Sequence, residues 1–181
     1  MLYEIDEILV RPLLTEDQYF LVKWLSDPKV LEYYEGRDNP FDMLKVEKSF
    51  YQRENGVFKS MVEFEGKCIG YIQYYEVNTE TSQITDYHED EIVYGIDQFI
   101  GETSYWNKGI GTLIVTSMVH YLIEQKQADR IIMDPHVSNK RALKCYEKCG
   151  FKKIRILSKH EWHEGEYRAC WLIEYTKEES K

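Results

Sequence analysis

The sequence lacks several features that would assign it to a specialised class of protein. Its 181 residues include only four cysteines, Cys68, Cys145, Cys149 and Cys170, and no Cys-x-x-Cys pair. Sparse cysteines without that spacing predict reduced thiols rather than a disulfide framework or a structural zinc site. Cys145 and Cys149 share a helix face by their spacing of four, but no histidine or further cysteine stands near them in the sequence. We therefore expect no metal.

Long apolar segments and excess positive charge are also missing. No run approaches the roughly 18 apolar residues that cross a membrane, and residues 1–7 carry no basic region ahead of an apolar stretch. We expect a cytoplasmic protein without a membrane partner. Lys and Arg number 23 against 32 Asp and Glu, a net charge of −9. This charge disfavours nucleic acid and favours cationic partners, although many proteins are acidic for solubility alone.

The residues that are present are sufficient for a folded core. Hydrophobic residues make up 43% of the chain and charged residues 30%, a composition that argues against disorder. One hydrophobic core commonly serves about 100 to 200 residues. We therefore expect one domain over residues 1–175 and a short polar tail over residues 176–181. Both a monomer and a homodimer are compatible with the sequence.

Hydrophobic periodicity and turn residues predict strands mixed with helices. The predicted strands are 8–13, 58–64, 68–77, 92–100, 130–133, 151–157 and 169–175, and the predicted helical segments are 19–25, 30–34, 44–53, one from 110 onward and 139–149. Both hairpins and crossovers occur, so we predict an α/β (α+β) fold with a mixed, mostly antiparallel sheet of about seven strands and helices on both faces. Gly95, inside the strand 92–100, suggests a bulge or a close backbone approach, and a merely tolerated glycine fits equally well.

A Gly-x-Gly turn opens the helix that starts near residue 110. Gly109 and Gly111 let a ligand approach backbone N–H groups at the positive end of the helix, an arrangement that binds phosphate. Spacing excludes two other phosphate motifs. A dinucleotide site needs a third glycine where Ile114 stands, and a nucleotide-hydrolysing P-loop needs a lysine after its glycine, whereas Lys108 precedes Gly109. A packing role for the two glycines stays open from this turn alone.

A second run, VSNKRALKCYEKCGF at residues 137–151, follows the next predicted strand. Together with WNKGIGT at residues 106–112, it resembles the coenzyme half of the GNAT superfamily of acyl-CoA N-acetyltransferases. The resemblance implies a GNAT fold with a bulged central strand, and acetyl-CoA as the cosubstrate. Trp106 departs from the pattern, because the family usually has Gln or Arg three residues before the first glycine.

The GNAT resemblance also implies which residues contact the coenzyme. The glycine turn would bind the pyrophosphate, the strand before it would hydrogen-bond the pantetheine amides, and the second run would lie beside the pantetheine and the thiol. The implied contacts are Phe99, Ile100, Lys108, Gly109, Ile110, Gly111, Thr112, Asn139, Ala142 and Tyr146. Tyr146 is either the proton donor to the departing thiolate or only a residue that lines the coenzyme channel.

Runs over nearly the whole chain resemble one group of this superfamily more closely. VKWLSDPKVLEYYEGRD, TDYHEDEIVYGIDQFIGE, MDPHVSNKRA and HEGE are similar to the aminoglycoside 6'-N-acetyltransferases, in particular the type fused to a phosphotransferase in Gram-positive cocci. The resemblance implies acetylation of the 6'-amine of an aminoglycoside such as kanamycin or tobramycin, which confers antibiotic resistance. The alternatives are a polyamine, a protein N-terminus or another metabolite amine as acceptor, and a non-catalytic acyl-CoA sensor, which Asp97 disfavours.

Asp97 corresponds in this resemblance to the carboxylate that accepts the proton of the attacking amine or orients that amine. Chemistry supports such a group, because only a neutral amine attacks a thioester and an aliphatic ammonium is almost fully protonated near neutral pH. A cationic acceptor also calls for carboxylates and flat aromatic faces around its cleft. The acceptor contacts predicted in this way are Asp97, Asp134, Glu32, Glu35, Asp38, Tyr34 and Tyr74.

Two further residues offer reactive groups that this chemistry does not require. Cys149 is not needed as an acetyl carrier, because direct transfer from a thioester to an amine uses no enzyme nucleophile. His136, which follows Pro135, suits a structural position or the edge of the acceptor site better than a catalytic one. Asp97 and Tyr146 therefore remain the two predicted catalytic residues.

Overall fold

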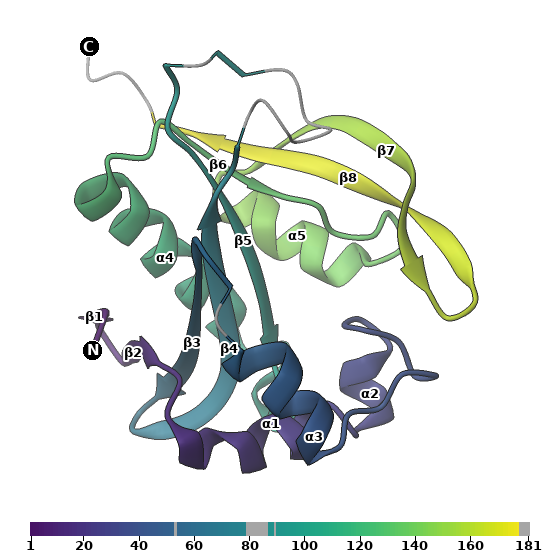
Figure 1. Ribbon diagram of the computed structural model, residues 1–181. Coiled ribbons are helices and arrows are strands. Elements are labelled where there is room, and N and C mark those ends of the chain that lie inside the picture. Colours follow the sequence, from purple (N-terminus) through teal and green to yellow (C-terminus); the bar gives the residue numbers. More distant parts are fainter. Residues whose placement is uncertain (53, 79–86, 89, 178–181) are drawn as a thin grey trace.

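The computed structural model describes residues 1–52, 54–78, 87–88 and 90–177 (Figure 1). Within these residues, eight strands form one sheet in the order β1-β2-β3-β4-β5-β6-β8-β7. The strands are β1 (Tyr3–Ile5), β2 (Ile8–Pro12), β3 (Val57–Phe64), β4 (Lys67–Glu76), β5 (Val93–Ile100), β6 (Arg130–Met133), β7 (Lys152–His163) and β8 (Glu166–Thr176). Only β5 and β6 are parallel, which confirms the mixed, mostly antiparallel sheet. The strand beyond the predicted seven is β1, which pairs with β2.

The helical segments are short before the sheet's central strands and longer after them. They are the 3-10 turns Thr15–Asp17 and Thr103–Tyr105, α1 (Gln18–Trp24), α2 (Pro28–Leu31), α3 (Met43–Val46), the π-helical turn Glu47–Tyr51, α4 (Ile110–Lys126) and α5 (Lys140–Lys148). Asp27 and Asp42 cap α2 and α3, because each carboxylate accepts a backbone N–H of the first turn. No helix in the described part of the chain combines the length and the apolar character needed to span a bilayer.

Two hydrophobic layers cover the two faces of the sheet (Figure 1). One layer contains α4 and α5, and the other contains α1, α2 and α3. Successive residues of β5 serve opposite layers, so that Ile96 packs with α4 and α5 whereas Phe99 packs with α1 and α2. The same alternation places the polar residues Asp97 and Gln98 on opposite faces. Each face of β5 therefore carries one polar side chain within an otherwise apolar strand.

A bulge occurs in a central strand, but it does not lie at Gly95. The extra residue is Ile69 of β4, because Val62 pairs with Gly70 and the next residue of β3 pairs with Cys68. The register between β4 and β5 is continuous along the whole of their ladder. Gly95 instead allows a close approach, since a Cβ there would stand 2.5 Å from the ring of Tyr75. Of the alternatives left open for Gly95, the structure therefore shows a close approach and no bulge, and the approaching group is a side chain instead of backbone.

The strands β5 and β6 pair at one end only. Their parallel register starts at Val93 and ends where Gly95 meets Ile132. Beyond that point β5 continues along β4, while Met133 of β6 pairs with β8. The sheet therefore opens beside the second half of β5, and the hairpin of β7 and β8 extends across this side of the molecule toward the loop after α2 (Figure 1).

Candidate active site

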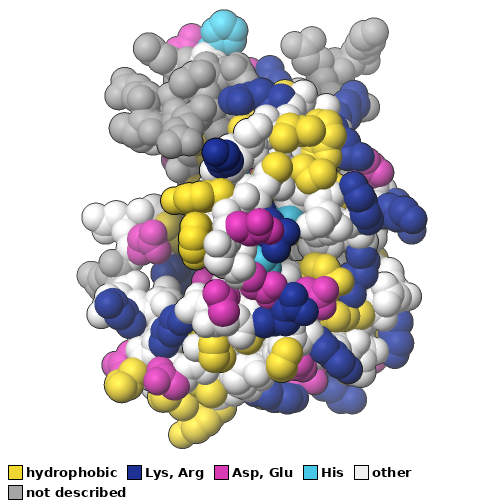
Figure 2. Space-filling view, turned by 90° about the vertical axis from the view of Figure 1, so that its right-hand side faces the viewer, with side chains coloured by type: hydrophobic (Ala, Val, Ile, Leu, Met, Phe, Trp, Pro, Cys, Tyr) yellow, Lys and Arg dark blue, Asp and Glu magenta, His cyan; other side chains and the backbone are white. Residues whose placement is uncertain are grey.

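A cleft of about 710 Å³ occupies the opening of the sheet. Figure 2 shows this side of the molecule, where acidic side chains gather around a histidine. Its volume lies in the usual range for small-molecule sites. The predicted site residues that line it are Tyr34, Glu35, Asp97, Phe99, Ile100, Gly109, Gly111, Thr112, Asp134, Asn139, Ala142 and Tyr146. The fold thus gathers most of the predicted catalytic, coenzyme and acceptor residues in one place.

Asp97 is held by a chain of hydrogen bonds from the neighbouring strand. Gln73 Nε2 donates to Asp97 Oδ2 at 2.8 Å, and the hydroxyl of Tyr71 donates to Gln73 Oε1 at 2.6 Å. Gln73 is the register partner of Asp97, so strand pairing places the two side chains on the same face. Both residues line the cleft. This chain of hydrogen bonds orients the Asp97 carboxylate and leaves it able to accept a proton.

The environment of Asp97 makes its carboxylate more basic than that of an exposed aspartate. Burial, the largest cause, together with the charges of Asp134 and Glu161 raises the pKa of Asp97 to about 6. The hydrogen bond from Gln73 acts in the opposite direction. A carboxyl group with this pKa is mostly ionised at neutral pH, yet it holds a proton more readily than an ordinary aspartate. Asp97 therefore suits the role of general base.

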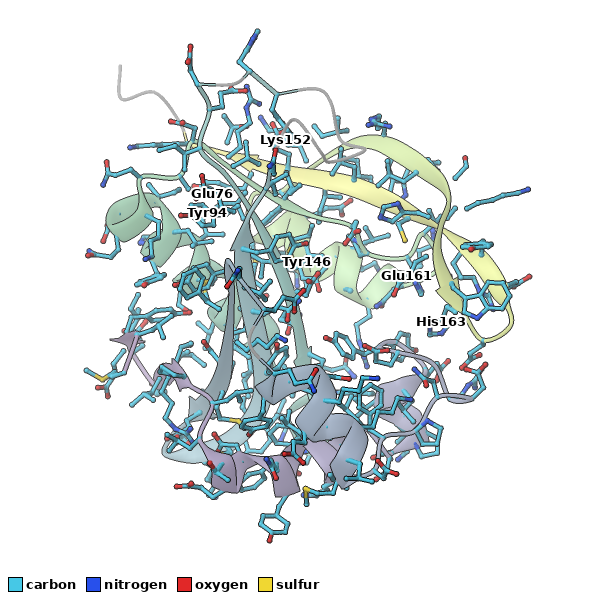
Figure 3. The ribbon with its side chains drawn as sticks, in the orientation of Figure 1. Glu76, Tyr94, Tyr146, Lys152, Glu161 and His163 are labelled. Atoms are coloured by element: carbon cyan, nitrogen blue, oxygen red, sulfur yellow. The ribbon has the colours of Figure 1, made fainter. Side chains whose placement is uncertain are left out.

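Tyr146 reaches the cleft from α5 (Figure 3). Its hydroxyl accepts a hydrogen bond from Gln98 Nε2 at 3.0 Å, which leaves the phenolic O–H free to donate to a ligand. Burial raises the pKa of Tyr146 far above its ordinary value, so the phenol stays protonated. The buried Gln98 Oε1 has no hydrogen-bond partner among the described residues. A ligand in the cleft can therefore find one acceptor and one proton donor here.

The glycine turn at the start of α4 has the open space that the sequence predicted. Gly109 is the N-cap with φ of +81°, a left-handed conformation that favours glycine, and nothing lies within 4 Å of the position of a Cβ there. At Gly111 a Cβ would stand 3.4 Å from the sulfur of Cys145. The first turn of a helix leaves backbone N–H groups without partners inside the helix. Open space and unpaired donors together suit a phosphate group.

The helix α5 supplies both predicted and unpredicted groups to the cleft. Asn139 is its N-cap and accepts the backbone N–H of Ala142 at 3.1 Å, which fixes both residues at the cleft wall. Arg141, Lys144 and Lys148 also line the cleft. These basic residues were not among the predicted contacts, because charged side chains on a helix are usually solvated. Their spacing of three and four was the available signal, since it places them on one helical face.

Trp106, the residue that departs from the GNAT pattern, has a defined role in the cleft wall. Its indole N–H donates to the carbonyl oxygen of Ile100 at 2.8 Å. The guanidinium of Arg141 lies 3.9 Å from the ring centroid of Trp106 and 4.7 Å from that of Tyr33. Cation–π contacts of this kind hold a positive charge beside the glycine turn. Arg141 thus reaches this region from α5, although Trp106 occupies the position where the family usually has Gln or Arg.

Acidic side chains line the other end of the cleft. Glu35 adopts φ of +71°, and burial and the charge of Glu161 raise the pKa of its carboxyl group. Asp134 is 2.7 Å from the Nε2 atom of His160, and Glu161 is 2.7 Å from that of His136. Glu161 comes from β7 (Figure 3) and was missed, because the predicted strand ended at residue 157. Together with Asp97, four carboxylates surround this part of the cleft.

Tyr74, a predicted acceptor contact, does not line the cleft. Its side chain is only 1% exposed and packs in the layer of α4 and α5. Its ring stacks on Phe58 with centroids 4.7 Å apart, and its hydroxyl is 3.4 Å from that of Tyr121. The reason is the alternation of β4, which places Tyr74 on the face opposite to its neighbour Gln73. The prediction for Tyr74 is therefore wrong.

Four other predicted contacts lie outside the cleft lining. Ile110 is 5% exposed and packs in the core, so only its backbone N–H remains available at the helix start. Lys108 is exposed, with its ammonium 5.8 Å from the ring centroid of Tyr105. Glu32 and Asp38 are exposed, and neither belongs to the residues that form the cleft wall. The loop after α2 therefore contributes Tyr34 and Glu35 to the cleft, but not its outer acids.

Comparison with known proteins agrees with this geometry. Residues 14–159 match the family described as acetyltransferase (GNAT) domain. The chain is 28% identical over 151 residues to aminoglycoside N(6')-acetyltransferase type 1 of Klebsiella pneumoniae, covering 82% of this chain and 75% of that protein. It is 42% identical over 64 residues to a kanamycin resistance protein of Rhizobium radiobacter, covering 35% of this chain and 59% of that protein.

Solved structures give the same result for the fold. The structure of AAC(6')-Ib in complex with ribostamycin and coenzyme A matches with a TM-score of 0.78 and 26% identity, covering 95% of this chain and 94% of that one. Spermidine N-acetyltransferase from Vibrio cholerae, in complex with CoA and spermine, matches with a TM-score of 0.76 and 17% identity, covering 94% and 95%. The second likeness, at so low an identity, supports the fold alone.

Proposed function

Because the chain belongs to the GNAT acetyltransferase family and is an acetyl-CoA-dependent N-acetyltransferase, we propose that its acceptor is the 6'-amine of an aminoglycoside. The observation that carries this proposal is the acidic end of the cleft, where Glu35, Asp134 and Glu161 surround Asp97. Several carboxylates in one cleft suit a ligand with several ammonium groups. The similarity to aminoglycoside acetyltransferases, over 82% of the chain in sequence and 95% in structure, supports the same acceptor class.

The coenzyme fits the opposite end of the cleft. Acetyl-CoA supplies the thioester, and its phosphates suit the glycine turn of α4 together with Arg141, Lys144 and Lys148. The buried Gln98 Oε1, which lacks a partner among the described residues, can accept a hydrogen bond from a ligand amide. These groups differ in chemistry from the acidic end, so each end favours one of the two substrates.

The residues between the two ends suit direct transfer. Asp97 accepts a proton from the acceptor ammonium, and the neutral amine nitrogen then bonds to the acetyl carbonyl carbon. As the carbon–sulfur bond breaks, the phenolic O–H of Tyr146 gives its proton to the departing sulfur, and the second proton that the amine nitrogen must lose replaces it on the phenol oxygen through solvent. Asp97 then releases its own proton to solvent. Gln73 holds the base in position through its hydrogen bond to the carboxylate, and Gln98 holds the acid through its hydrogen bond to the phenol oxygen. No enzyme nucleophile is needed.

A polyamine is the second candidate acceptor, because the same carboxylates attract any flexible polycation. The two classes differ in shape, since an aminoglycoside presents its amines on rigid sugar rings. Tyr34 and Tyr75 line the cleft and offer flat faces for such rings, whereas a polyamine chain has no ring to place against them. These aromatic walls favour the aminoglycoside.

The test is release of free thiol from acetyl-CoA with kanamycin, spermidine and a basic peptide offered separately. We expect the largest kcat/KM with kanamycin. A matched aminoglycoside that carries a 6'-hydroxyl in place of the 6'-amine should give no turnover. Turnover of spermidine without turnover of kanamycin would show that the acceptor is a polyamine, and equal turnover of the 6'-hydroxyl compound would show that another amine is acetylated.

A further inference from the structure

A separate group of metal-ligating side chains lies at the edge of the acidic end of the cleft. His136 Nε2 is 2.7 Å from Glu161 Oε2, and the sulfur of Cys170 is 4.0 Å from the same oxygen. The three ligand atoms all lie within 4.8 Å of one another. Cys170 is fully buried, and acetyl transfer gives its thiol no role. His136 and Glu161 line the cleft, so an ion can enter this group from there.

Backbone pairing holds two of the three positions together. His136 and Cys170 form an antiparallel bridge. Hydrogen bonds flank this bridge, from Val137 N to Ala169 O at 3.0 Å and from Trp171 N to Pro135 O at 2.9 Å. Residues directly opposite each other in an antiparallel pair present their side chains to one face. The imidazole and the thiol are therefore brought together by the sheet, without any flexible segment between them.

An irregularity in β7 brings the third ligand to the same place. Leu157 pairs with Cys170, and the next recorded pair joins Glu161 to Arg168. Between these two pairs, β7 advances by four residues and β8 by only two. Lys159, which lies in this stretch of β7, has φ of +50°. Extra residues of this kind redirect side chains and are frequent beside functional sites. Here the irregularity turns Glu161 toward the cleft, as Figure 3 shows for its side chain on β7.

We propose that His136, Glu161 and Cys170 bind a zinc ion at the edge of the acceptor site. Imidazole, carboxylate and thiolate are the ligand types of protein zinc sites, and three protein ligands leave a fourth position open to water or substrate. Magnesium and calcium prefer oxygen ligands alone and do not suit a thiol. The thiol releases its proton to solvent as the sulfur–zinc bond forms.

Binding requires only a small rearrangement of the three side chains. Zinc bonds of about 2.0–2.3 Å in a tetrahedron place ligand atoms ~3.3–3.7 Å apart. The hydrogen bond between His136 and Glu161 must therefore open, and the distance between the imidazole nitrogen and the sulfur of Cys170, now within 4.8 Å, must shorten by up to about 1.3 Å. The negative charge of Asp134, which acts on both Asp97 and Cys170, favours a cation in this region. A bound ion would occupy Glu161 and add positive charge where an acceptor ammonium is expected.

Zinc should therefore inhibit acetyl transfer in competition with the acceptor and not with acetyl-CoA. This inhibitory role rests on the proposed acceptor site, whereas zinc binding itself does not. The two can be measured apart, because binding needs neither substrate.

Binding is tested on the metal-free full chain by competition for zinc with a chromophoric chelator. We expect one zinc per chain at this site and at least ~10-fold weaker binding in Cys170→Ser, since even loss of an outer partner of a ligand costs this much. Cys145→Ser, which removes a thiol elsewhere in the cleft, should bind zinc like the wild type. Binding that survives Cys170→Ser, or that is lost in Cys145→Ser, would overturn the proposal.

A second measurement keeps the ligand assignment testable if Cys170→Ser destabilises the fold. Cobalt(II) added to the wild-type chain should give a thiolate-to-cobalt charge-transfer band, and His136→Gln should weaken cobalt binding while Cys170 is intact. Absence of the band would exclude Cys170 as a ligand.

The inhibitory role is tested by steady-state kinetics with and without zinc. Zinc should raise the apparent KM for the acceptor, and Cys170→Ser should retain its activity without zinc and lose the inhibition. Zinc binding with an unchanged acceptor KM would overturn the inhibitory role alone. Failure of every aminoglycoside to react would instead overturn the proposed function, and it would leave the binding result as measured.

Discussion

The two ends of the cleft carry opposite charges and are built in different ways. The basic end, which we propose binds the coenzyme and call the coenzyme end, contains Arg141, Lys144 and Lys148, which all come from α5, next to the glycine turn of α4. The acidic end, which we propose binds the acceptor and call the acceptor end, contains four carboxylates from four separate segments: Glu35, Asp97, Asp134 and Glu161. An anionic coenzyme and a cationic acceptor can thus be bound side by side without competing for the same groups. Only the coenzyme end is encoded in contiguous runs of sequence.

The sharpest test of this division is Asp97→Asn, which removes the proposed base and keeps the shape of the side chain. We expect kcat to fall by about 100-fold or more, because general base catalysis contributes this much or more. Steady-state kinetics with kanamycin measures the loss. Calorimetry should show unchanged affinity for coenzyme A, since the residue belongs to the acceptor end. Unchanged kcat would exclude Asp97 as the base.

Tyr146→Phe tests the proton donor, which lies between the two ends. We expect kcat to fall about 10-fold at neutral pH, less than for loss of the base, because a thiol with a pKa near about 8.5 leaves readily as its anion. The loss should shrink as pH rises, because a thiolate needs less protonation in alkaline solution. A pH series of kcat measures this. A loss that is the same at every pH would indicate a role in lining the channel only.

Gly109→Val should act on the coenzyme end alone. A side chain in this left-handed conformation costs about 1–2 kcal/mol and fills the space open to a phosphate, so we expect the KM for acetyl-CoA to rise by about 10-fold. Gly66→Val is the matched control, because Gly66 has φ of +72°, equally open surroundings and a place in the turn between β3 and β4, outside the cleft lining. Equal effects of both variants on KM would point to general destabilisation instead of coenzyme binding.

Glu161→Gln should give the smallest effect and alter the pH dependence of the acceptor end. The charge of Glu161 raises the pKa of Asp97, so its removal lowers that pKa. Activity requires ionised Asp97, and kcat/KM should therefore rise with pH through about 6 in the wild type and at a lower pH in the variant. Glu35→Gln is the control, expected to raise the acceptor KM without moving the profile. Identical pH profiles of kcat/KM for the wild type and Glu161→Gln would show that Glu161 does not influence the pKa of Asp97.

Much of the fold could be predicted because its signals are local. The hairpin of β3 and β4 follows from two alternating runs around the turn at Gly66, and it is confirmed. β1 is only three residues long and was missed, since so short a run shows no periodicity. The prediction for β7 ended too early, because the irregular register after Leu157 interrupts the alternation.

The sequence by itself determined the family, the glycine turn and the helical run at residues 137–151 that contains Tyr146, because backbone donors at a helix start and one face of a helix are set by neighbours in the chain. Only the tertiary structure decided which charges meet in the acceptor end. Glu161 lies in the cleft because the register of β7 is irregular, and Tyr74 lies outside it because side chains alternate between the two faces of β4. Strand face and long-range pairing control these positions, and neither can be read from a residue's immediate neighbours.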